Sequence, residues 1–362
     1  MTALPSPALV IDRARMTANI DRMSRAMRDA GVALRPHFKT SKMIEVARLQ
    51  SEAGAVGFTC ATPEEVDVLL TAGFADLFWA HGPVGAKATL AAEFNRRGRV
   101  AIGVDSVELA EPVSREAARL GVTVPVRLEI DTGLGRTGIR ASDAVVVATA
   151  LAGLPNLEFE GVYTHEGQLA GVSGDRAAIR AAGVSAAEAL VAVAEDIRAS
   201  GLPVSVVSVG STPGWDSAPT VAGVTEARPG TYVFSDANQL RLESTTLDQC
   251  ALTVRASVVS VQRPGAVIID AGLKAMSADG SNRGSTFGLL LTPEFELDDT
   301  VEFPTAYEEH GTLVGRGIAD LRVGDTVALL PNHACGVVNM WGTVHVLDED
   351  GAVQTWHPVG RH

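Results

Sequence analysis

A basic segment near the N-terminus, Arg35-Pro36-His37-Phe38-Lys39-Thr40-Ser41-Lys42, carries a residue well suited to covalent chemistry. It follows a short apolar run, Val32-Ala33-Leu34, and places Lys39 where a buried strand would end. Burial lowers the pKa of an amine, and an unprotonated amine attacks a carbonyl to form a Schiff base. Pyridoxal phosphate is the cofactor most often held in this way. Taken alone, a lysine with basic neighbours is more typical of a solvated surface.

Four later segments also place polar or small residues at the ends of apolar runs. They are Asp131-Thr132-Gly133-Leu134-Gly135-Arg136, Tyr163-Thr164-His165, Gly210-Ser211-Thr212 and Arg228-Pro229-Gly230-Thr231-Tyr232. The last two consist largely of small residues whose backbone N–H groups suit a phosphate. Each segment alone has a simpler interpretation as a turn, a surface ion pair or a core histidine. Their shared position at strand ends favours a single site.

A second constellation, Pro331-Asn332-His333-Ala334-Cys335, lies near the C-terminus. In an extended strand residues i and i+2 project to one face, so His333 and Cys335 are candidates to share a metal. Imidazole with thiolate favours zinc among common cellular metals. Catalytic zinc usually takes three protein ligands, so substrate or water would complete the shell. Taken alone, this spacing is more typical of a buried cysteine beside a structural histidine.

Composition limits the classes of function. With 362 residues, the chain has room for one large barrel and a smaller unit. The net charge is −13 and no basic cluster stands out, which argues against nucleic acid or an anionic membrane as a partner. No apolar run is expected to reach transmembrane length. Three scattered cysteines and the absence of a secretory signal predict a reduced, cytoplasmic setting.

The first two thirds of the chain alternate short apolar runs with longer amphipathic ones, including Pro63–Ala72, Val107–Leu120 and Ala177–Ser200. The expected strands are Ala33–Arg35, Val56–Cys60, Leu77–Ala80, Val100–Val104, Val126–Ile130, Phe159–Tyr163, Val204–Val207 and Val224–Ala227. Eight strands that alternate with helices predict a closed (β/α)8 TIM-type barrel over residues 13–242. Chemistry in such a barrel sits at the carboxyl ends of the strands.

Beyond residue 242 the pattern changes to Val- and Thr-rich runs separated by Gly, Pro and Asp. The runs are Cys250–Val261, Ala266–Asp270, Gly311–Val314, Thr326–Leu330 and Thr343–Leu347. They predict an antiparallel β domain. The opening strand Ala8–Ile11 precedes the barrel and is expected to pair into this domain. The predicted β domain therefore comprises residues 1–12 and 243–362.

Several motifs occur together and in order along nearly the whole chain. They are Pro7-Ala8-Leu9-Val10-Ile11-Asp12, the Lys39 segment, the Asp131–Arg136 loop, Pro229-Gly230-Thr231-Tyr232-Val233-Phe234, Asp270-Ala271-Gly272-Leu273-Lys274, Glu309-His310-Gly311 and the His333–Cys335 segment. In this combination the chain resembles the fold-type III pyridoxal phosphate enzymes, whose barrel is shared with alanine racemase. The resemblance is greatest to the D-threonine aldolase and D-serine dehydratase group.

The resemblance assigns roles residue by residue. Lys39 would hold the cofactor as an imine, and His165 would lie against its pyridine ring. Arg136 would lie near the phenolic oxygen, and Arg228 would face the pyridine nitrogen. Phosphate would be bound by Ser211, Thr212, Gly230 and Thr231. His333 and Cys335 would hold a divalent metal, with zinc favoured and manganese as the alternative, and the metal would grip the substrate's β-hydroxyl.

Three positions depart from the group's pattern. Ser41 replaces a histidine that usually follows the lysine segment, and Ala61 replaces a common glutamine. The group's aldolases usually carry His-x-Asp, so Cys335 follows the dehydratase pattern, yet Gly336-Val337 stands where Pro-Thr is usual. These departures bear on the substrate.

The resemblance implies a metal-dependent lyase that acts on small D-β-hydroxy amino acids. The cysteine favours the D-serine dehydratase outcome, a 2-oxo acid and ammonia, over the aldolase outcome, glycine and an aldehyde. A racemase is less favoured because the metal motif would be idle. A non-catalytic cofactor-binding protein is less favoured because such proteins usually consist of the barrel alone. A homodimer is expected, since sites of this fold type are usually completed by the partner's β domain.

Overall fold

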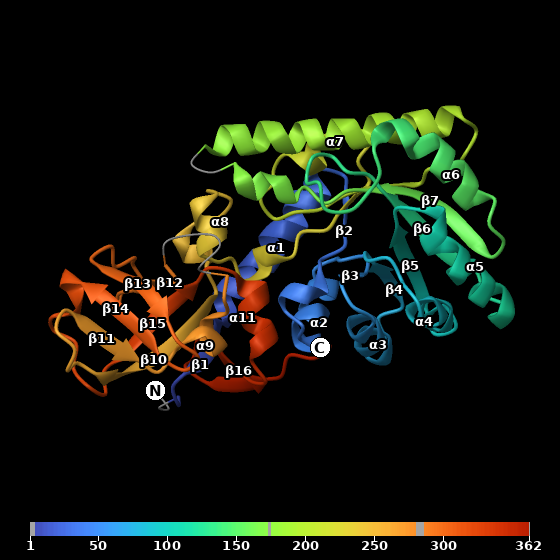
Figure 1. Cartoon of the computed structure of the whole chain (residues 1–362). Helices are drawn as coiled ribbons and strands as arrows, with labels where there is room; N and C mark the ends of the chain where they lie inside the picture. Colours follow the sequence, from blue (N-terminus) through green and yellow to red (C-terminus); the bar gives the residue numbers. More distant parts are fainter. Residues whose placement is uncertain (1–3, 173–174, 280–285, 362) are drawn as a thin grey trace. The chain divides into compact units, whose positions relative to one another are not determined.

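A computed structural model describes residues 4–172, 175–279 and 286–361 of the chain (Figure 1). These residues form two compact units. The barrel unit comprises residues 21–39, 44–230 and 359–361, and the β unit comprises residues 4–20, 40–43 and 231–358 where described. Helix α1 (Arg13–Asp29) contributes to both units. The sequence-based domain limits of 13–242, and of 1–12 with 243–362, stay a proposal.

The barrel unit contains eight parallel strands in the order β2-β9-β8-β7-β6-β5-β4-β3. The strands are β2 (Ala33–Leu34), β3 (Phe58–Cys60), β4 (Asp76–Trp79), β5 (Arg99–Val104), β6 (Val124–Glu129), β7 (Leu157–Tyr163), β8 (Val206–Val209) and β9 (Glu226–Ala227). An isolated parallel bridge between His37 and Thr59 closes the sheet, and Thr59 N donates to Pro36 O at 2.8 Å. The predicted (β/α)8 barrel and its eight strands are confirmed.

Helices follow the strands along the chain. They are α2 (Ile44–Glu52), α3 (Pro63–Thr71), α4 (Lys87–Phe94), α5 (Val107–Leu120), α6 (Ala144–Ala152) and α7 (Arg176–Ala199). Local sequence fixes their ends. The Thr62 hydroxyl accepts the Glu65 N–H and Pro63 occupies the first turn, as helix-start chemistry predicts. Helix α5 ends at Gly121, whose φ of 66° is a left-handed conformation that glycine adopts without strain.

Among the described residues, α7 is the one helix long and apolar enough by composition to cross a membrane. The expectation that no apolar segment would reach that length is therefore corrected. The helix packs on β7, β8 and α6, and Ile179, Leu190 and Ile197 are buried along it. This packing accounts for much of its apolar composition, because the outer helices of a barrel bury one face against the strands.

A ladder of buried charges crosses the barrel interior. Arg35 Nε donates to Glu226 at 2.6 Å, and Arg127 Nη1 donates to the same carboxylate at 2.7 Å. Arg127 Nε also donates to Glu160 at 3.0 Å, and its guanidinium lies 4.4 Å from the centre of the Phe78 ring. Burial opposes ionisation of Glu226, but Arg127 and Arg35 outweigh it and lower its pKa to about 2. The ladder thus links β2, β6, β7 and β9 through paired charges.

The β unit is built on a nine-stranded sheet. Its strands are β1 (Ala8–Asp12), β10 (Leu252–Ser260), β11 (Ala266–Ile269), β12 (Gly288–Leu291), β13 (Val301–Ala306), β14 (Gly311–Gly315), β15 (Thr326–Pro331), β16 (Val344–Leu347) and β17 (Val353–Trp356). The opening strand β1 pairs with β10, as predicted from the sequence. Its second pairing, with β16, is parallel, so the sheet is mixed where a purely antiparallel one was expected.

Short helices connect the strands of the β unit: α8 (Ala237–Arg241), α9 (Leu273–Met276) and α11 (Ala334–Met340). A small apolar cluster in this unit includes Ala237, Cys250, Leu291 and Leu330. Cys250 is fully buried there, and burial raises the pKa of its thiol to about 12. Cys250 is therefore a packing residue with no reactive thiolate.

Candidate active site

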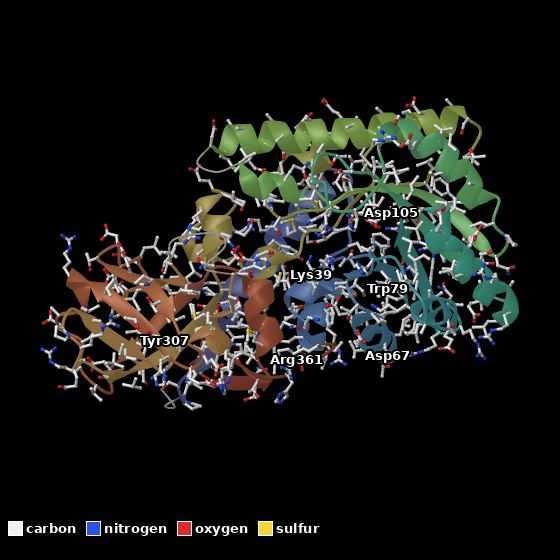
Figure 2. The ribbon with its side chains drawn as sticks, in the orientation of Figure 1. Lys39, Asp67, Trp79, Asp105, Tyr307 and Arg361 are labelled. Carbon is white, nitrogen blue, oxygen red and sulfur yellow. The ribbon has the colours of Figure 1, made fainter. Side chains whose placement is uncertain are left out.

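The barrel unit has a cavity of about 440 Å³ at the carboxyl ends of β2 to β6. Lys39, in the short turn after β2, lines it together with Asp105 after β5 and Glu129 at the end of β6. Figure 2 labels Lys39 and Asp105 among the side chains of the barrel unit. Arg136 enters the cavity from the loop after β6, and His81 from the segment after β4. The predicted position of Lys39 and Arg136 at the carboxyl rim therefore agrees with the geometry of the barrel.

The Asp131–Arg136 loop owes its shape to its first residue. The Asp131 carboxylate accepts the backbone N–H of Gly133 at 2.9 Å and of Gly135 at 3.1 Å. These hydrogen bonds lower the pKa of Asp131, because they stabilise its charged form. Gly133 and Gly135 have φ of 125° and 68°, which suits glycine at this tight turn. The loop thereby delivers the exposed Arg136 to the cavity.

His165 follows β7 and has a fixed tautomer. Its Nδ1 lies 2.6 Å from the carbonyl oxygen of Gly210, which can only accept, so Nδ1 carries the proton. Burial, with the charges of Lys39 and Arg136, lowers the pKa of His165 to about 3. The imidazole is therefore neutral near pH 7 and keeps Nε2 as an acceptor. Its contact with a cofactor ring stays a prediction.

The loops after β8 and β9 come together in the barrel unit. Gly210, Ser211, Arg228 and Pro229 line one small cavity of about 10 Å³. Ser211 Oγ accepts the Gly214 N–H at 3.2 Å, so the hydroxyl is held within its own turn. Of the other residues predicted to bind phosphate, Thr212 is buried and Gly230 is half-buried. Thr231 belongs to the β unit by its contacts.

Arg228 is buried and hydrogen-bonded to neutral groups. Its Nη2 donates to Thr164 O at 2.6 Å, and its Nη1 donates to the Ser208 hydroxyl. Ser208 in turn donates to Glu226 at 2.7 Å, which couples Arg228 to the charge ladder. Burial lowers the pKa of Arg228 from its ordinary value, although a guanidinium stays charged. Whether this arginine faces a pyridine nitrogen stays a prediction.

The structure corrects the geometry expected for His333 and Cys335. Strand β15 ends at Pro331, His333 is the extended residue that precedes α11, and Cys335 lies in the first turn of that helix. An extended strand is therefore the wrong basis for their pairing, because the backbone turns into a helix between them. The two side chains still interact. Burial would lower the pKa of His333, but Cys335 and Asp236 outweigh it and raise that pKa to about 11.

Three residues surround this pair within the β unit. The fully buried Asp236 has Oδ2 3.4 Å from His333 Nδ1 and accepts the Ala334 N–H at 2.9 Å. The Cys335 sulfur lies 3.1 Å from Thr40 Oγ1 and 3.8 Å from Thr231 Oγ1. Thr231 was predicted to bind phosphate, and in the structure its hydroxyl lies near the Cys335 sulfur.

The donor set fits a metal held by two protein ligands. No group of three or more His, Cys, Asp or Glu side chains suited to a metal occurs among the residues that the structure describes. His333 Nδ1 is also buried, and it makes no hydrogen bond of good geometry with any residue that the structure describes. An imidazole and a thiolate suit zinc or a similar transition ion, and a carboxylate beside a ligating histidine commonly orients it. Asp236 is placed for that orienting role.

Sequence reasoning missed several residues at these sites. Asp105 follows β5 and Glu129 is the last residue of β6, a signal that was available because the carboxyl rim predicts functional side chains. Glu129 also accepts the Tyr163 hydroxyl at 3.1 Å. Asp236 is the side-chain cap of α8, and an Asp before a helical run is a recognisable cap signal. Glu166, beside His165, carried no such signal.

Comparisons with known proteins define the class. The family described as "Alanine racemase, N-terminal domain" matches residues 11–238, and "Putative serine dehydratase domain" matches residues 251–347. The chain belongs to this family, the alanine racemase-like, fold-type III pyridoxal phosphate enzymes. The resemblance inferred from the motifs is therefore confirmed.

Individual relatives narrow the class to lyases. The D-threo-3-hydroxyaspartate dehydratase of Delftia sp. (strain HT23) is 35% identical over 98% of this chain and 97% of its own. Its solved structure superposes with a TM-score of 0.93, at 34% identity, and covers 98% of each chain. A D-threonine aldolase from Arthrobacter sp. is 30% identical over 98% of this chain and 92% of its own. This chain is a pyridoxal phosphate-dependent lyase of the same family.

Two further solved structures, both of a D-threo-3-hydroxyaspartate dehydratase, bear on the metal. One is of a histidine-to-alanine mutant, and another is of a cysteine-to-alanine mutant in the metal-free form. Both superpose with a TM-score of 0.93. The mutated histidine and cysteine are two residues apart in that protein, the spacing of His333 and Cys335 here. A cofactor and a metal are thus implied for the family.

Proposed function

We propose that the protein dehydrates a D-β-hydroxy amino acid to a 2-oxo acid and ammonia. The observation that carries this proposal is the histidine–cysteine pair His333 and Cys335, with the buried Asp236 beside the imidazole. Support comes from the 35% identical hydroxyaspartate dehydratase, for which a cysteine mutant was solved metal-free. Retro-aldol cleavage to glycine and an aldehyde is the second candidate, because a 30% identical relative is a D-threonine aldolase.

The barrel residues are assigned to the cofactor. Lys39 holds pyridoxal phosphate, Arg136 lies near its phenolic oxygen, and the neutral His165 lies against the ring. Arg228 faces the pyridine nitrogen, and Ser211, Thr212, Gly230 and Thr231 bind the phosphate. Once bound, the cofactor supplies an electron sink that makes the substrate's Cα–H acidic. Lys39 lines the cavity and would take up that proton as the general base.

The metal ligands are assigned in the β unit. His333 and Cys335 hold a divalent metal, and Asp236 orients the imidazole. A metal there acts as a Lewis acid on the β-hydroxyl, which otherwise leaves poorly. We propose zinc because a thiolate ligand disfavours magnesium and calcium, with manganese as the alternative.

The substrate is a small amino acid, and the products distinguish the candidates. Purified protein is incubated with D-serine, D-threo-3-hydroxyaspartate and D-threonine. Dehydration gives ammonia with pyruvate from D-serine or oxaloacetate from hydroxyaspartate. Retro-aldol cleavage instead gives glycine and an aldehyde, and racemisation gives the L-isomer. Glycine as the main product from every substrate would replace the dehydratase proposal by the aldolase.

We further propose a homodimer that works in the cytoplasm. Support for the dimer is the fold type, in which the partner's β domain usually completes the site. Sedimentation velocity of the holoenzyme at micromolar concentration gives the assembly state directly. A monomer with full activity would contradict the dimer. Fractionation of the native host, with the enzyme followed by antibody, tests the compartment.

A further inference from the structure

Glu166 is a buried carboxylate to which the proposed chemistry assigns no role. It follows His165 in the loop after β7 and is 1% exposed. Its two carboxylate oxygens lie 3.3 and 3.0 Å from the backbone nitrogen of Gly210, which donates to them. The Ser211 hydroxyl also hydrogen-bonds this carboxylate. One side chain therefore holds the first two residues of the loop after β8.

Both backbone polar groups of Gly210 are hydrogen-bonded to neighbouring side chains. Its carbonyl oxygen accepts from His165 Nδ1 at 2.6 Å, and its N–H donates to the neighbouring Glu166. A Cβ at this position would lie 3.0 Å from the Arg228 side chain, so a larger residue would require that side chain to shift. His165 and Glu166 together thus fix the peptide planes on both sides of Gly210.

The space beside Glu166 is too small to hold a phosphate. The space bounded by Glu166, Ser211 and Arg228 is about 10 Å³, which admits about one water molecule and no phosphate. Burial raises the pKa of Glu166, while the Arg228 charge and the Gly210 N–H oppose that rise. The nearby Arg228 guanidinium offsets the charge of this carboxylate.

We propose that Glu166 is a positioning residue for phosphate recognition: it sets the direction of the Gly210 peptide and of the Ser211 hydroxyl so that the loop binds a phosphate monoester. The inference rests on the proposed function, in which Ser211 and Thr212 bind the cofactor's phosphate. The alternative is a purely structural tie between the loops after β7 and β8.

The test compares two ligands that differ only in the phosphate. Apoprotein is prepared from the wild type, Glu166→Gln and Glu166→Ala, and titrated with pyridoxal phosphate and with pyridoxal. Absorbance of the Lys39 imine reports both titrations. We expect Glu166→Ala to weaken pyridoxal phosphate binding about tenfold or more, because the loop after β8 loses the acceptor that anchors its first two residues. Glu166→Gln keeps one acceptor oxygen and should weaken it less. Pyridoxal binding should change less than about twofold in both variants.

Glu65→Gln is the matched control. Glu65 is also a fully buried carboxylate of the barrel unit and accepts a backbone N–H, that of Ala61, at 2.7 Å. Its replacement should lower the thermal midpoint without changing the ratio of the two affinities. The ³¹P resonance of the bound phosphate gives a second readout and should shift in the Glu166 variants but not in Glu65→Gln.

The outcomes separate the inference from the function on which it rests. Equal weakening of both ligands in the Glu166 variants, or no change in either, would overturn the positioning role. If wild-type apoprotein forms no imine, or binds pyridoxal phosphate no more tightly than pyridoxal, the proposed function itself fails. If the wild type prefers the phosphate and the Glu166 variants lose that preference, both stand.

Discussion

Asp236 Oδ2 lies 3.4 Å from Nδ1 of His333, and the same oxygen accepts the N–H of Ala334 at 2.9 Å. Its other oxygen accepts the N–H of Gln239 at 2.9 Å in the first turn of α8. A single buried carboxylate therefore lies beside a histidine and accepts from the starts of two helices. A carboxylate next to a ligating imidazole commonly orients it.

We predict that Asp236→Asn weakens zinc binding about 10- to 100-fold, because the imidazole loses its orienting charge. Asparagine keeps one acceptor oxygen, so the fold should survive the change. Zinc affinity is measured by competition with a chromophoric chelator. Asp248→Asn, at an exposed position of the same unit, is the matched control and should bind zinc normally. Unchanged affinity in Asp236→Asn would remove Asp236 from the metal site.

The barrel ladder yields a prediction about pH. The pKa of Glu226 is lowered to about 2 in the folded state, against an ordinary value of about 4.5. A carboxylate with a lowered folded-state pKa stabilises the fold above its unfolded pKa, and this stability is lost as pH falls toward 2. Glu226→Gln should thus cost about 3 kcal/mol at pH 7, since it leaves Arg35 and Arg127 without their shared partner.

The difference in unfolding free energy between wild type and Glu226→Gln should be constant from pH 7 to 5 and shrink below about pH 4.5. Urea unfolding at a series of pH values measures it. Glu116→Gln removes an exposed partner of Arg119 and is the control, with little effect expected at any pH. A Glu226→Gln difference that does not vary with pH would show that the carboxylate's charge is unimportant.

Much of the barrel could be predicted because its parallel strands are buried on both faces and read as short apolar runs. The charge ladder interrupts those runs: Arg127 in β6, Glu160 in β7 and Glu226 in β9 are charged residues buried within the strands. Opposite charges inside neighbouring strands were a readable signal of paired side chains in the interior. The partner of each charge still depended on strand order, which the sequence did not state.

Other parts of the site depended on contacts remote in sequence. Glu166 meets Gly210 across 44 residues, and Asp236 meets Ala334 across 98. A lone glutamate or aspartate in a loop is ordinarily a solvated residue, so neither role was visible. The turn from β15 into α11 was also missed. His333 and Cys335 lie in a run too short for its periodicity to distinguish a strand from a helix start.

Lys39→Ala should abolish both cofactor imine absorbance and turnover, because no other amine is assigned to form the imine. The variant is reconstituted with pyridoxal phosphate, reduced with borohydride and mapped by peptide mass spectrometry. Lys87→Ala, exposed at the start of α4, is the control and should retain the label and the activity. If the labelled peptide from Lys39→Ala protein contains Lys42, the imine forms at Lys42 and the assignment to Lys39 is wrong.

Removal of the metal should separate cofactor binding from cleavage. Chelation or His333→Ala is expected to eliminate β-hydroxy amino acid turnover and leave the Lys39 imine intact, because the two residues belong to different compact units. Hydroxide leaves poorly, and a divalent ion contributes several kcal/mol of charge stabilisation as it departs. The control is His357→Ala, which replaces an exposed histidine of the β unit and should keep both activity and metal.

Protein purified without chelator should contain near-stoichiometric zinc or a similar transition ion, measured by plasma mass spectrometry. Full turnover after exhaustive chelation would show that His333 and Cys335 are packing residues and do not hold a catalytic metal.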